Sequence, residues 1–318
     1  MNLIIFIISI ISIILFLIIC YIVKLKYREF KFKNQNYINS KSTILITGGC
    51  CGIGYEIIKN LISITKCKII NLDIRKDLFS KLELEFKSNL KNIYIDLSIP
   101  QNLEKFFIKN NINLNEINIL INNAGIAFNL PIEKLSIEQM NKTIQTNLIT
   151  PLNLIKILIN NHLNNNSNLN NNIIKLHIVT IASTMSHLIC QKSSDYISSK
   201  WGLYAFHESV RAEFLYRNDI IFSIFCPFCV NTGMFNGFKN PLIGILNILD
   251  VHEIGKNIVK SIILKDKIIF YPEISWILIF IYKLFPIYIS DLIQYYIFGY
   301  SVKNLEGRKE NDKLFKLN

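Results

Sequence analysis

Hydrophobic and polar positions alternate in a regular order between residues 43 and 271. Short runs rich in isoleucine and valine predict strands, and longer stretches with one apolar face predict helices between them. The expected strands cover residues 43–47, 68–73, 92–95, 117–122, 173–182, 220–226 and 267–271. The expected helices cover residues 52–64, 78–90, 136–160 and 194–217, with another between the third and fourth strands. This alternation predicts an α/β fold with a doubly wound, mostly parallel sheet, whose ligands bind at the carboxyl ends of the strands.

The N-terminal segment differs from this pattern because residues 3–23 contain no charged side chain. A helix of that length rises roughly 30 Å, which matches the hydrocarbon core of a bilayer. The segment lacks a basic start and a small-residue cleavage site, so we expect a retained transmembrane anchor over residues 1–23 instead of a removed signal peptide. The linker that follows, residues 24–42, is basic. Because basic flanks stay on the cytoplasmic side of a membrane, we expect the rest of the chain in the cytosol.

A second apolar stretch, residues 276–300, is rich in tyrosine and phenylalanine. It is interrupted by residues that a membrane span would rarely carry, namely Lys283, Pro286, Asp291 and Gln294. We therefore expect segment 273–300 to contact a membrane surface, to cover a substrate pocket, or to pack in the core. Residues 301–318 are expected to form a polar tail, and the asparagine-rich stretch 163–172 to form an insert between a helix and a strand.

Composition changes this picture only in part. The 318 residues are 51% hydrophobic and 18% charged, with a formal net charge of +12. Such a composition excludes an intrinsically disordered chain. The positive charge is compatible with nucleic acid or with a membrane surface. The chain has no basic recognition helix and no alternation of basic and aromatic residues, so nucleic-acid binding is not favoured, and the basic linker would favour anionic lipid.

The seven cysteines are odd in number and scattered, which favours a reducing compartment over a disulfide framework. Cys226 and Cys229 form a C-x-x-C motif. A redox pair of this type normally opens a helix after an early strand, whereas this motif follows the sixth expected strand, so redox chemistry is not favoured. The chain has no cluster of cysteine and histidine that predicts a metal site.

The first expected strand ends in a glycine-rich turn, because residues 47–54 read TGGCCGIG. Glycine permits a tight turn, and the backbone N–H groups at the start of the next helix can bind a pyrophosphate. Asp73 ends the second expected strand, where an acid accepts hydrogen bonds from ribose hydroxyls and repels a 2′-phosphate. Two basic residues, Arg75 and Lys76, follow closely. These features predict a dinucleotide site that prefers NAD to NADP.

Three further residues suit proton transfer. Tyr196 and Lys200 are four residues apart on an expected helix and therefore share one face. A neighbouring ammonium group stabilises a phenolate, which would lower the pKa of Tyr196 toward the working range of an acid/base catalyst. Ser183 follows an expected strand at the edge of the sheet where ligands bind, and its hydroxyl could hydrogen-bond a carbonyl oxygen.

The glycine turn, the Asn122-Asn123-Ala124-Gly125 stretch, Asn147, Ser183 and the Tyr-x-x-x-Lys pair occur together in this order. In this combination, residues 43–271 resemble the short-chain dehydrogenase/reductases. The resemblance implies a Rossmann-type catalytic domain over residues 43–272 that oxidises or reduces CH–OH groups. Tyr196 would be the acid/base, and Lys200 would lower its pKa and hold the nicotinamide ribose. Ser183 would polarise the substrate oxygen, and Asn147 would maintain a water-linked proton relay.

The same resemblance implies a set of residues close to NAD, with NADP less favoured. Asp96 would contact adenine, and Thr232 would contact the nicotinamide carboxamide. The full set is Thr47, Gly48, Gly52, Ile53, Gly54, Asp73, Asp96, Asn123, Ala124, Gly125, Tyr196, Lys200, Pro227, Val230 and Thr232.

Residues 177–183, 206–213 and 226–233 are similar to a membrane-bound branch of the family, which includes 17-beta-hydroxysteroid dehydrogenase type 11 and the epidermal retinol dehydrogenases. This similarity implies a lipophilic substrate such as a retinoid, a steroid or a long-chain lipid. It also implies a location on endoplasmic reticulum or lipid droplets, and a homodimer is a further expectation. Two departures are a serine at position 186, where glycine is usual, and the Cys50-Cys51 pair in the turn.

Two alternatives remain open. An NADPH-dependent 3-ketodihydrosphingosine reductase is another anchored member of the family, but Asp73 argues against NADPH. A non-catalytic scaffold on a lipid surface could retain a dinucleotide fold, but the complete set of catalytic residues argues against a decayed site.

Overall fold

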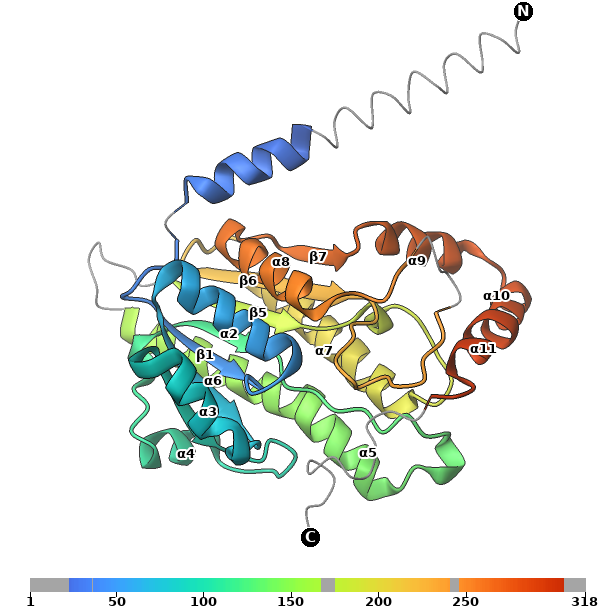
Figure 1. Ribbon diagram of the computed structural model, residues 1–318, viewed down its shortest axis with the longest axis horizontal. Helices are drawn as coiled ribbons and strands as arrows, with labels where there is room; N and C mark the ends of the chain where they lie inside the picture. The colour runs from blue at the N-terminus through green and yellow to red at the C-terminus, as the bar shows by residue number, and fades with distance from the viewer. Residues whose placement is uncertain (1–22, 36, 167–174, 241–245, 306–318) are drawn as a thin grey trace, which may run out of the picture.

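The structure, a computed structural model, describes residues 23–35, 37–166, 175–240 and 246–305. A fully parallel, seven-stranded sheet runs through the described chain in the order β3-β2-β1-β4-β5-β6-β7 (Figure 1). Its strands are β1 (Thr43–Thr47), β2 (Lys68–Asp73), β3 (Leu90–Tyr94), β4 (Ile117–Asn122), β5 (Leu176–Ile181), β6 (Ile220–Pro227) and β7 (Ile268–Tyr271). The expected α/β fold is confirmed, and each expected strand is present within a few residues of its expected bounds.

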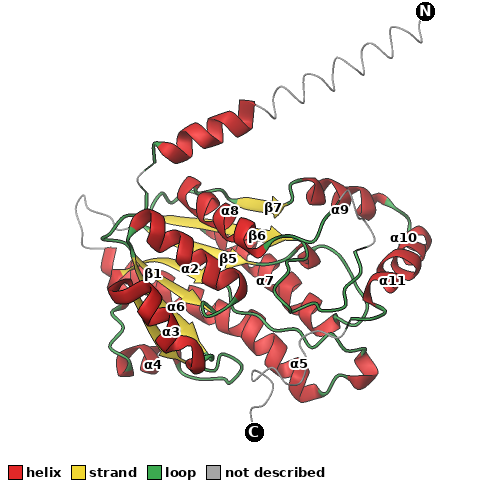
Figure 2. Cartoon of the chain, in the orientation of Figure 1, coloured by secondary structure: helices red, strands yellow, loops and turns green. Residues whose placement is uncertain are grey.

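Helices cover both faces of the sheet (Figure 2). One face packs against α2 (Gly52–Thr65), α3 (Phe79–Phe86) and α8 (Val251–Leu264). The other packs against α4 (Leu103–Lys109), α6 (Thr150–Asn166) and α7 (Ser194–Glu213). Because side chains alternate along a strand, Ile44 and Ile46 of β1 enter the first core, whereas Leu45 enters the second. Burial on both faces explains why the central strands are apolar at nearly every position.

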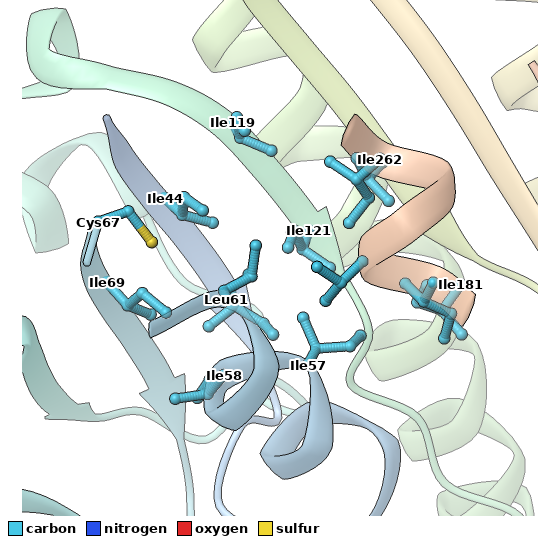
Figure 3. Packing of buried hydrophobic residues seen from close by; sticks show 14 of the residues in the cluster. Ile44, Ile57, Ile58, Leu61, Cys67, Ile69, Ile119, Ile121, Ile181 and Ile262 are labelled. Atoms are coloured by element: carbon cyan, nitrogen blue, oxygen red, sulfur yellow. The ribbon is translucent and has the colours of Figure 1, made fainter. Parts of the chain in front are cut away.

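The first core shows this packing directly. Ile57, Ile58 and Leu61 of α2 lie over Ile44 of β1, with α8 beside them (Figure 3). The sequence pattern did not predict α8. The signal was present, however, because Ile254, Ile258 and Ile262 recur at helical spacing and Asp250 accepts backbone hydrogen bonds at the helix start.

The long helix expected over residues 136–160 is divided in the structure. It consists of α5 (Ile137–Ile144), a π-helical turn η5 (Gln145–Ile149) that contains Asn147, and α6. Pro151 has no N–H to donate to the carbonyl of Asn147, which accounts for a wider turn at this position. The helix expected over residues 78–90 is also shorter, since α3 ends at Phe86 and the chain enters β3 at Leu90.

The ends of the chain are described in part. Residues 23–33 of the basic linker form a helix, here called helix 23–33, and all of the expected anchor except Val23 lies outside the described residues. Within the described ranges, no helix is both long and apolar enough to cross a membrane. Segment 273–300 consists of α9 (Ile274–Leu284), α10 (Ile287–Ile293), a π-helical turn η7 (Gln294–Phe298) and the start of α11 (Gly299–Val302). Residues 167–172 of the expected insert and residues 306–318 of the expected tail also lie outside the described residues.

Candidate active site

A cleft of about 890 Å³ opens at the carboxyl ends of the strands, at the edge that the parallel sheet predicts. The expected catalytic residues Ser183, Tyr196 and Lys200 all line it. It is also lined by most of the residues expected near the cofactor, namely Gly48, Gly52, Ile53, Asp73, Asp96, Asn123, Ala124, Gly125, Pro227, Val230 and Thr232. The remaining expected residues, Thr47, Gly54 and Asn147, are not part of the lining.

The glycine turn joins β1 to α2 and needs its glycines at two positions of positive φ, +69° at Gly48 and +58° at Gly52. A Cβ atom at Gly54 would lie 2.1 Å from the carbonyl oxygen of Gly48, so only glycine lets the helix start this close to the turn. A Cβ atom at Gly52, which lines the cleft, would lie 3.4 Å from the methyl group of Thr232. The missing side chains of Gly48 and Gly52 leave their backbone atoms in the lining of the cleft.

Two side chains of β2 accept hydrogen bonds from the backbone of the glycine turn and hold it in place. The N–H of Gly49 donates to Oδ1 of Asn71 at 2.9 Å, and the N–H of Cys50 donates to Oδ2 of Asp73 at 2.8 Å. Asn71 is fully buried and was missed by the sequence analysis. Its only signal in the sequence was a polar residue inside an otherwise apolar strand, where an amide needs a partner.

The end of β4 is tied to the same turn. Thr47 Oγ1 accepts hydrogen bonds from the N–H groups of Asn123 and Ala124, each at 3.1 Å. The side-chain amide of Asn123 donates to the carbonyl oxygens of Thr47 at 3.0 Å and Gly48 at 2.9 Å. Thr47 and Asn123 thus shape the floor of the cleft by fixing two strand ends together.

Acidic residues gather at one end of the cleft. Asp73 is buried, and its second carboxylate oxygen accepts the N–H of Arg75 at 2.9 Å. Asp96 accepts two hydrogen bonds from Ser98, one from its N–H at 2.8 Å and one from its hydroxyl at 2.7 Å. Both carboxylates are therefore held in fixed positions by the loops that follow β2 and β3.

The expected proton-transfer residues lie at the other end, on α7 and on the loop after β5. Tyr196 and Lys200 are both buried, and Nζ of Lys200 lies 5.8 Å from the centre of the Tyr196 ring. The Lys200 ammonium donates to the carbonyl oxygen of Ile181 at 3.0 Å. Ser183 accepts the N–H of Met185 at 3.1 Å and begins a short 3₁₀ turn, η6 (Thr184–Ser186). The spacing in the sequence correctly brought these three residues to one cleft.

Burial dominates the electrostatics of this trio. It raises the pKa of Tyr196 to about 12, although the hydrogen bond with Ser183 acts in the lowering direction. Burial also lowers the pKa of Lys200 to about 8. The lowering of the Tyr196 pKa that we expected from Lys200 is therefore not seen in the protein alone. With this raised pKa, Tyr196 keeps its proton at neutral pH.

Asn147 connects the π-helical turn to the catalytic helix. Its Oδ1 accepts the N–H of Ile126 at 2.8 Å, and its Nδ2 donates to the Ile126 carbonyl at 2.9 Å and to Ser199 Oγ at 3.0 Å. A Cβ atom at Gly125 would lie 3.5 Å from Asn147 Oδ1 and 3.6 Å from Lys200 Nζ. Both side chains therefore lie next to Gly125.

An apolar wall faces the proton-transfer residues and was missed by the sequence analysis. It consists of Phe128, Leu130, Met185, Met234, Phe235 and Phe238. The Phe235 ring meets the Tyr196 ring edge-on, with 5.3 Å between the ring centres. Val302 and Leu305 pack behind this wall in the same apolar cluster. The sequence offered only a local enrichment in methionine and phenylalanine at residues 234–238.

The C-x-x-C motif lies close to the site without a redox arrangement. Cys226 and Cys229 are free thiols in the structure. Burial raises the pKa of both thiols, that of Cys229 to about 12. A reactive thiol needs a lowered pKa, so this environment is typical of structural cysteines.

The family model of the short chain dehydrogenases matches residues 42–241, which is more than half of the chain. The chain belongs to the short-chain dehydrogenase family. It is accordingly an NAD(P)-dependent dehydrogenase that acts on CH–OH groups. Its cofactor is a nicotinamide dinucleotide.

Known proteins support the same branch that the sequence resembled. The chain is 28% identical over 253 residues to 17-beta-hydroxysteroid dehydrogenase 13 of Rattus norvegicus, with 77% of this chain and 79% of the relative covered. It is 26% identical over 239 residues to estradiol 17-beta-dehydrogenase 11 of Homo sapiens, with 72% and 74% covered. The resemblance to the hydroxysteroid branch is thereby confirmed.

Solved structures show the same fold. One is a 4-hydroxyisoleucine dehydrogenase complexed with NADH, with a TM-score of 0.60 and 24% identity over 70% of this chain and 90% of that chain. Another is a short-chain dehydrogenase from Sphingobium yanoikuyae in complex with NADPH, with a TM-score of 0.61 and 20% identity over 73% of this chain and 88% of that chain. The two neighbours hold different dinucleotides, so the fold accommodates either one.

Proposed function

We propose that this dehydrogenase is anchored in a membrane and transfers a hydride between NAD(H) and the hydroxyl or ketone of a lipophilic molecule, such as a retinoid, a steroid or a long-chain lipid. The observation that carries the proposal is a single cleft with Ser183, Tyr196 and Lys200 between the glycine turn and the apolar wall around Phe235. The relatives named as hydroxysteroid and estradiol dehydrogenases support an apolar substrate.

The bound dinucleotide supplies or accepts the hydride, and the residues of the chain handle the proton. In reduction, the Tyr196 hydroxyl donates its proton to the substrate oxygen, and in oxidation the phenolate accepts one. The Ser183 hydroxyl donates a hydrogen bond to the same oxygen. Lys200 would hold the nicotinamide ribose. Asn147, beside Lys200, maintains the path through which Tyr196 exchanges protons with solvent.

The residues at the acidic end of the cleft fit an NAD molecule. The glycine turn offers backbone N–H groups at the start of α2, where a pyrophosphate binds. Asp73 stands at the end of β2, where its carboxylate can accept hydrogen bonds from ribose hydroxyls. A 2′-phosphate beside this carboxylate would be repelled, which favours NAD over NADP. Asp96 and Thr232 line the same cleft, and we expect Asp96 to contact the adenine and Thr232 the nicotinamide amide.

The apolar residues outside the cleft support a membrane location, on endoplasmic reticulum or lipid droplets, with the catalytic domain in the cytosol. Residues 1–23 would form the anchor. Helix 23–33 is held against the two ends of β7 by Arg28, which lies 2.6 Å from Asp266 before the strand, and by Lys24, which lies 3.1 Å from Glu273 after it.

The side chains of α9, α10 and η7 favour contact with lipid over a closed lid, because many of them point outward. Phe280 is 56% exposed and Tyr295 is 69% exposed. An apolar surface of this kind marks an interaction site. We expect a homodimer to form through the helices that carry Asn147 and Tyr196.

The mechanism is tested by Tyr196→Phe. Loss of the acid/base should lower turnover by about 10²–10⁴-fold, while binding of NADH, measured by fluorescence, stays unchanged. Turnover is measured with a panel of lipid alcohols and ketones and with both dinucleotides. Tyr204→Phe is the matched control, because Tyr204 lies on the same helix but does not line the cleft. Unchanged NAD-linked turnover of the panel by Tyr196→Phe would falsify the mechanism.

A further inference from the structure

Arg75 lies at the acidic end of the cleft, and its side chain is held by a residue that the mechanism above does not use. Arg75 lines the cleft together with Asp73, Asp96 and Ser98. Its Nε donates to Oδ1 of Asp77 at 3.0 Å, and its Nη2 donates to Oδ2 of the same carboxylate at 3.0 Å. Asp77 itself is not part of the lining.

The backbone after β2 creates this arrangement. The N–H of Arg75 donates to Asp73, and the N–H of Leu78 donates to the carbonyl of Arg75 at 3.0 Å. The resulting 3₁₀ turn η1 (Lys76–Leu78) brings Asp77 alongside the Arg75 side chain. Arg75 therefore stands between two carboxylates, one bound to its backbone and the other to its guanidinium group.

A guanidinium group presents two parallel N–H bonds that match a carboxylate, and the same fork matches a phosphate. Arg75 would thus be a phosphate ligand at the ribose end of the cleft if its fork were not occupied by Asp77. A cation at this place would also offset the repulsion between Asp73 and a 2′-phosphate. The charge of Asp73 alone is therefore not enough for the protein to prefer NAD to NADP.

We propose that Asp77 is a cofactor-selectivity residue, which favours NAD by keeping the guanidinium group of Arg75 away from a 2′-phosphate. This inference rests on the NAD preference proposed above. Asp73 repels the 2′-phosphate by its charge. Asp77 binds the guanidinium group of Arg75, which could otherwise bind the 2′-phosphate. The side chains of Arg75 and Asp77 are 20% and 40% exposed, and the guanidinium group contacts the carboxylate at two points, a geometry that makes an ion pair near the surface stronger than a single contact would.

The test compares ligands that differ only in the 2′-phosphate. Adenosine 2′,5′-bisphosphate and adenosine 5′-monophosphate are titrated calorimetrically, and NADPH and NADH by fluorescence, against the full chain. In Asp77→Asn, we expect affinity for the 2′-phosphorylated member of each pair to rise about tenfold relative to its partner, the gain typical of a charged hydrogen bond. The double variant Asp77→Asn/Arg75→Met should lose this gain.

Glu85→Gln is the matched control, because it removes one negative charge from nearby α3 without touching Arg75. An unchanged affinity ratio in Asp77→Asn overturns the role of Asp77, and so does a gain that persists without Arg75 or that also occurs in Glu85→Gln. The affinity ratios of these variants test the role of Asp77, whereas the wild-type affinities test the NAD preference. Tighter binding of NADPH than of NADH by the wild-type protein would refute the proposed NAD preference itself.

Discussion

The two ends of the cleft are built by different kinds of contact. At the acidic end, backbone N–H groups and short polar side chains hold each other, as Gly49 holds Asn71 and Cys50 holds Asp73. At the other end, the wall opposite Tyr196 is held by apolar packing of Phe235 and by Val302 behind it. The first kind of contact fixes atoms at defined distances, whereas the second only fills volume.

This difference reflects the two ligands that we propose. A dinucleotide is always the same molecule, so its site needs particular groups at particular spacings. A lipophilic substrate needs mainly apolar surface and a single polar contact at the reacting oxygen. The acidic end is therefore expected to tolerate little change, and the apolar end considerably more.

The strongest challenge to the acidic end is Gly54→Ala. The added Cβ atom would lie 2.1 Å from the Gly48 carbonyl oxygen and 2.6 Å from Asn123 Nδ2, so the turn must shift. We expect NADH affinity to fall by about 100-fold, which corresponds to about 3 kcal/mol, the upper range for overpacking. Fluorescence titration and a thermal melt measure the two consequences.

Gly202→Ala is the control for this change. Its Cβ atom would meet only the flexible end of Leu148, at 3.0 Å, and Gly202 does not line the cleft. NADH affinity should stay within about twofold of the wild type, a change below the usual effect of a surface substitution. Normal affinity and stability in Gly54→Ala would show that the turn is less constrained than we infer.

Lys200 lies with Tyr196 at the end of the cleft opposite the acidic residues, and it allows a test of the site by pH. Its pKa is lowered from its ordinary value near 10.5 to about 8 by burial. Between these two values, the unfolded chain binds more protons at this residue than the folded chain, so the free energy of unfolding contributed by Lys200 rises with pH. Below pH 8 the contribution is constant.

We therefore compare the free energy of unfolding of the wild type with that of Lys200→Met. The difference, wild type minus variant, should increase by about 2 kcal/mol between pH 7 and pH 9.5. Urea unfolding of both proteins at several pH values gives the difference. Lys105→Met, at an exposed lysine on α4, controls for loss of a charge. A difference between wild type and Lys200→Met that does not change with pH would contradict the lowered pKa.

The contrast between the two ends also explains what the sequence could and could not predict. The glycine turn, Asp73 and the Tyr196–Lys200 pair were predicted because each depends on local spacing along one strand or helix. The strands of the sheet were predicted for the same reason. Most of these residues line one cleft, although Thr47 and Gly54 of the glycine turn do not.

Other features depend on contacts that only the folded backbone creates. Asn71 gains its role from the turn above it, and Phe235 from the Tyr196 ring. The Arg75–Asp77 pair requires the 3₁₀ turn after β2, which no pattern indicated. The pKa of Tyr196 is set by burial, and burial is known only once the apolar wall is in place. The sequence therefore predicts features that depend on local spacing, at both ends of the cleft, and misses contacts that only the folded backbone creates.

The smallest expected effect concerns the outer side of the apolar end, where α9 carries exposed Trp276. The chain has two tryptophans, Trp201 and Trp276, so Trp201→Phe leaves a single reporter on this helix. On phospholipid vesicles with brominated acyl chains, we expect the fluorescence of Trp276 to be quenched, because aromatic side chains settle at the membrane interface.

A triple variant, Trp201→Phe/Trp276→Phe/Tyr216→Trp, moves the reporter to a position that is 99% exposed just beyond the C-terminal end of α7. Equal quenching of the two reporters would refute a defined lipid-facing side, whereas selective quenching of Trp276 would mean that α9 lies against the lipid.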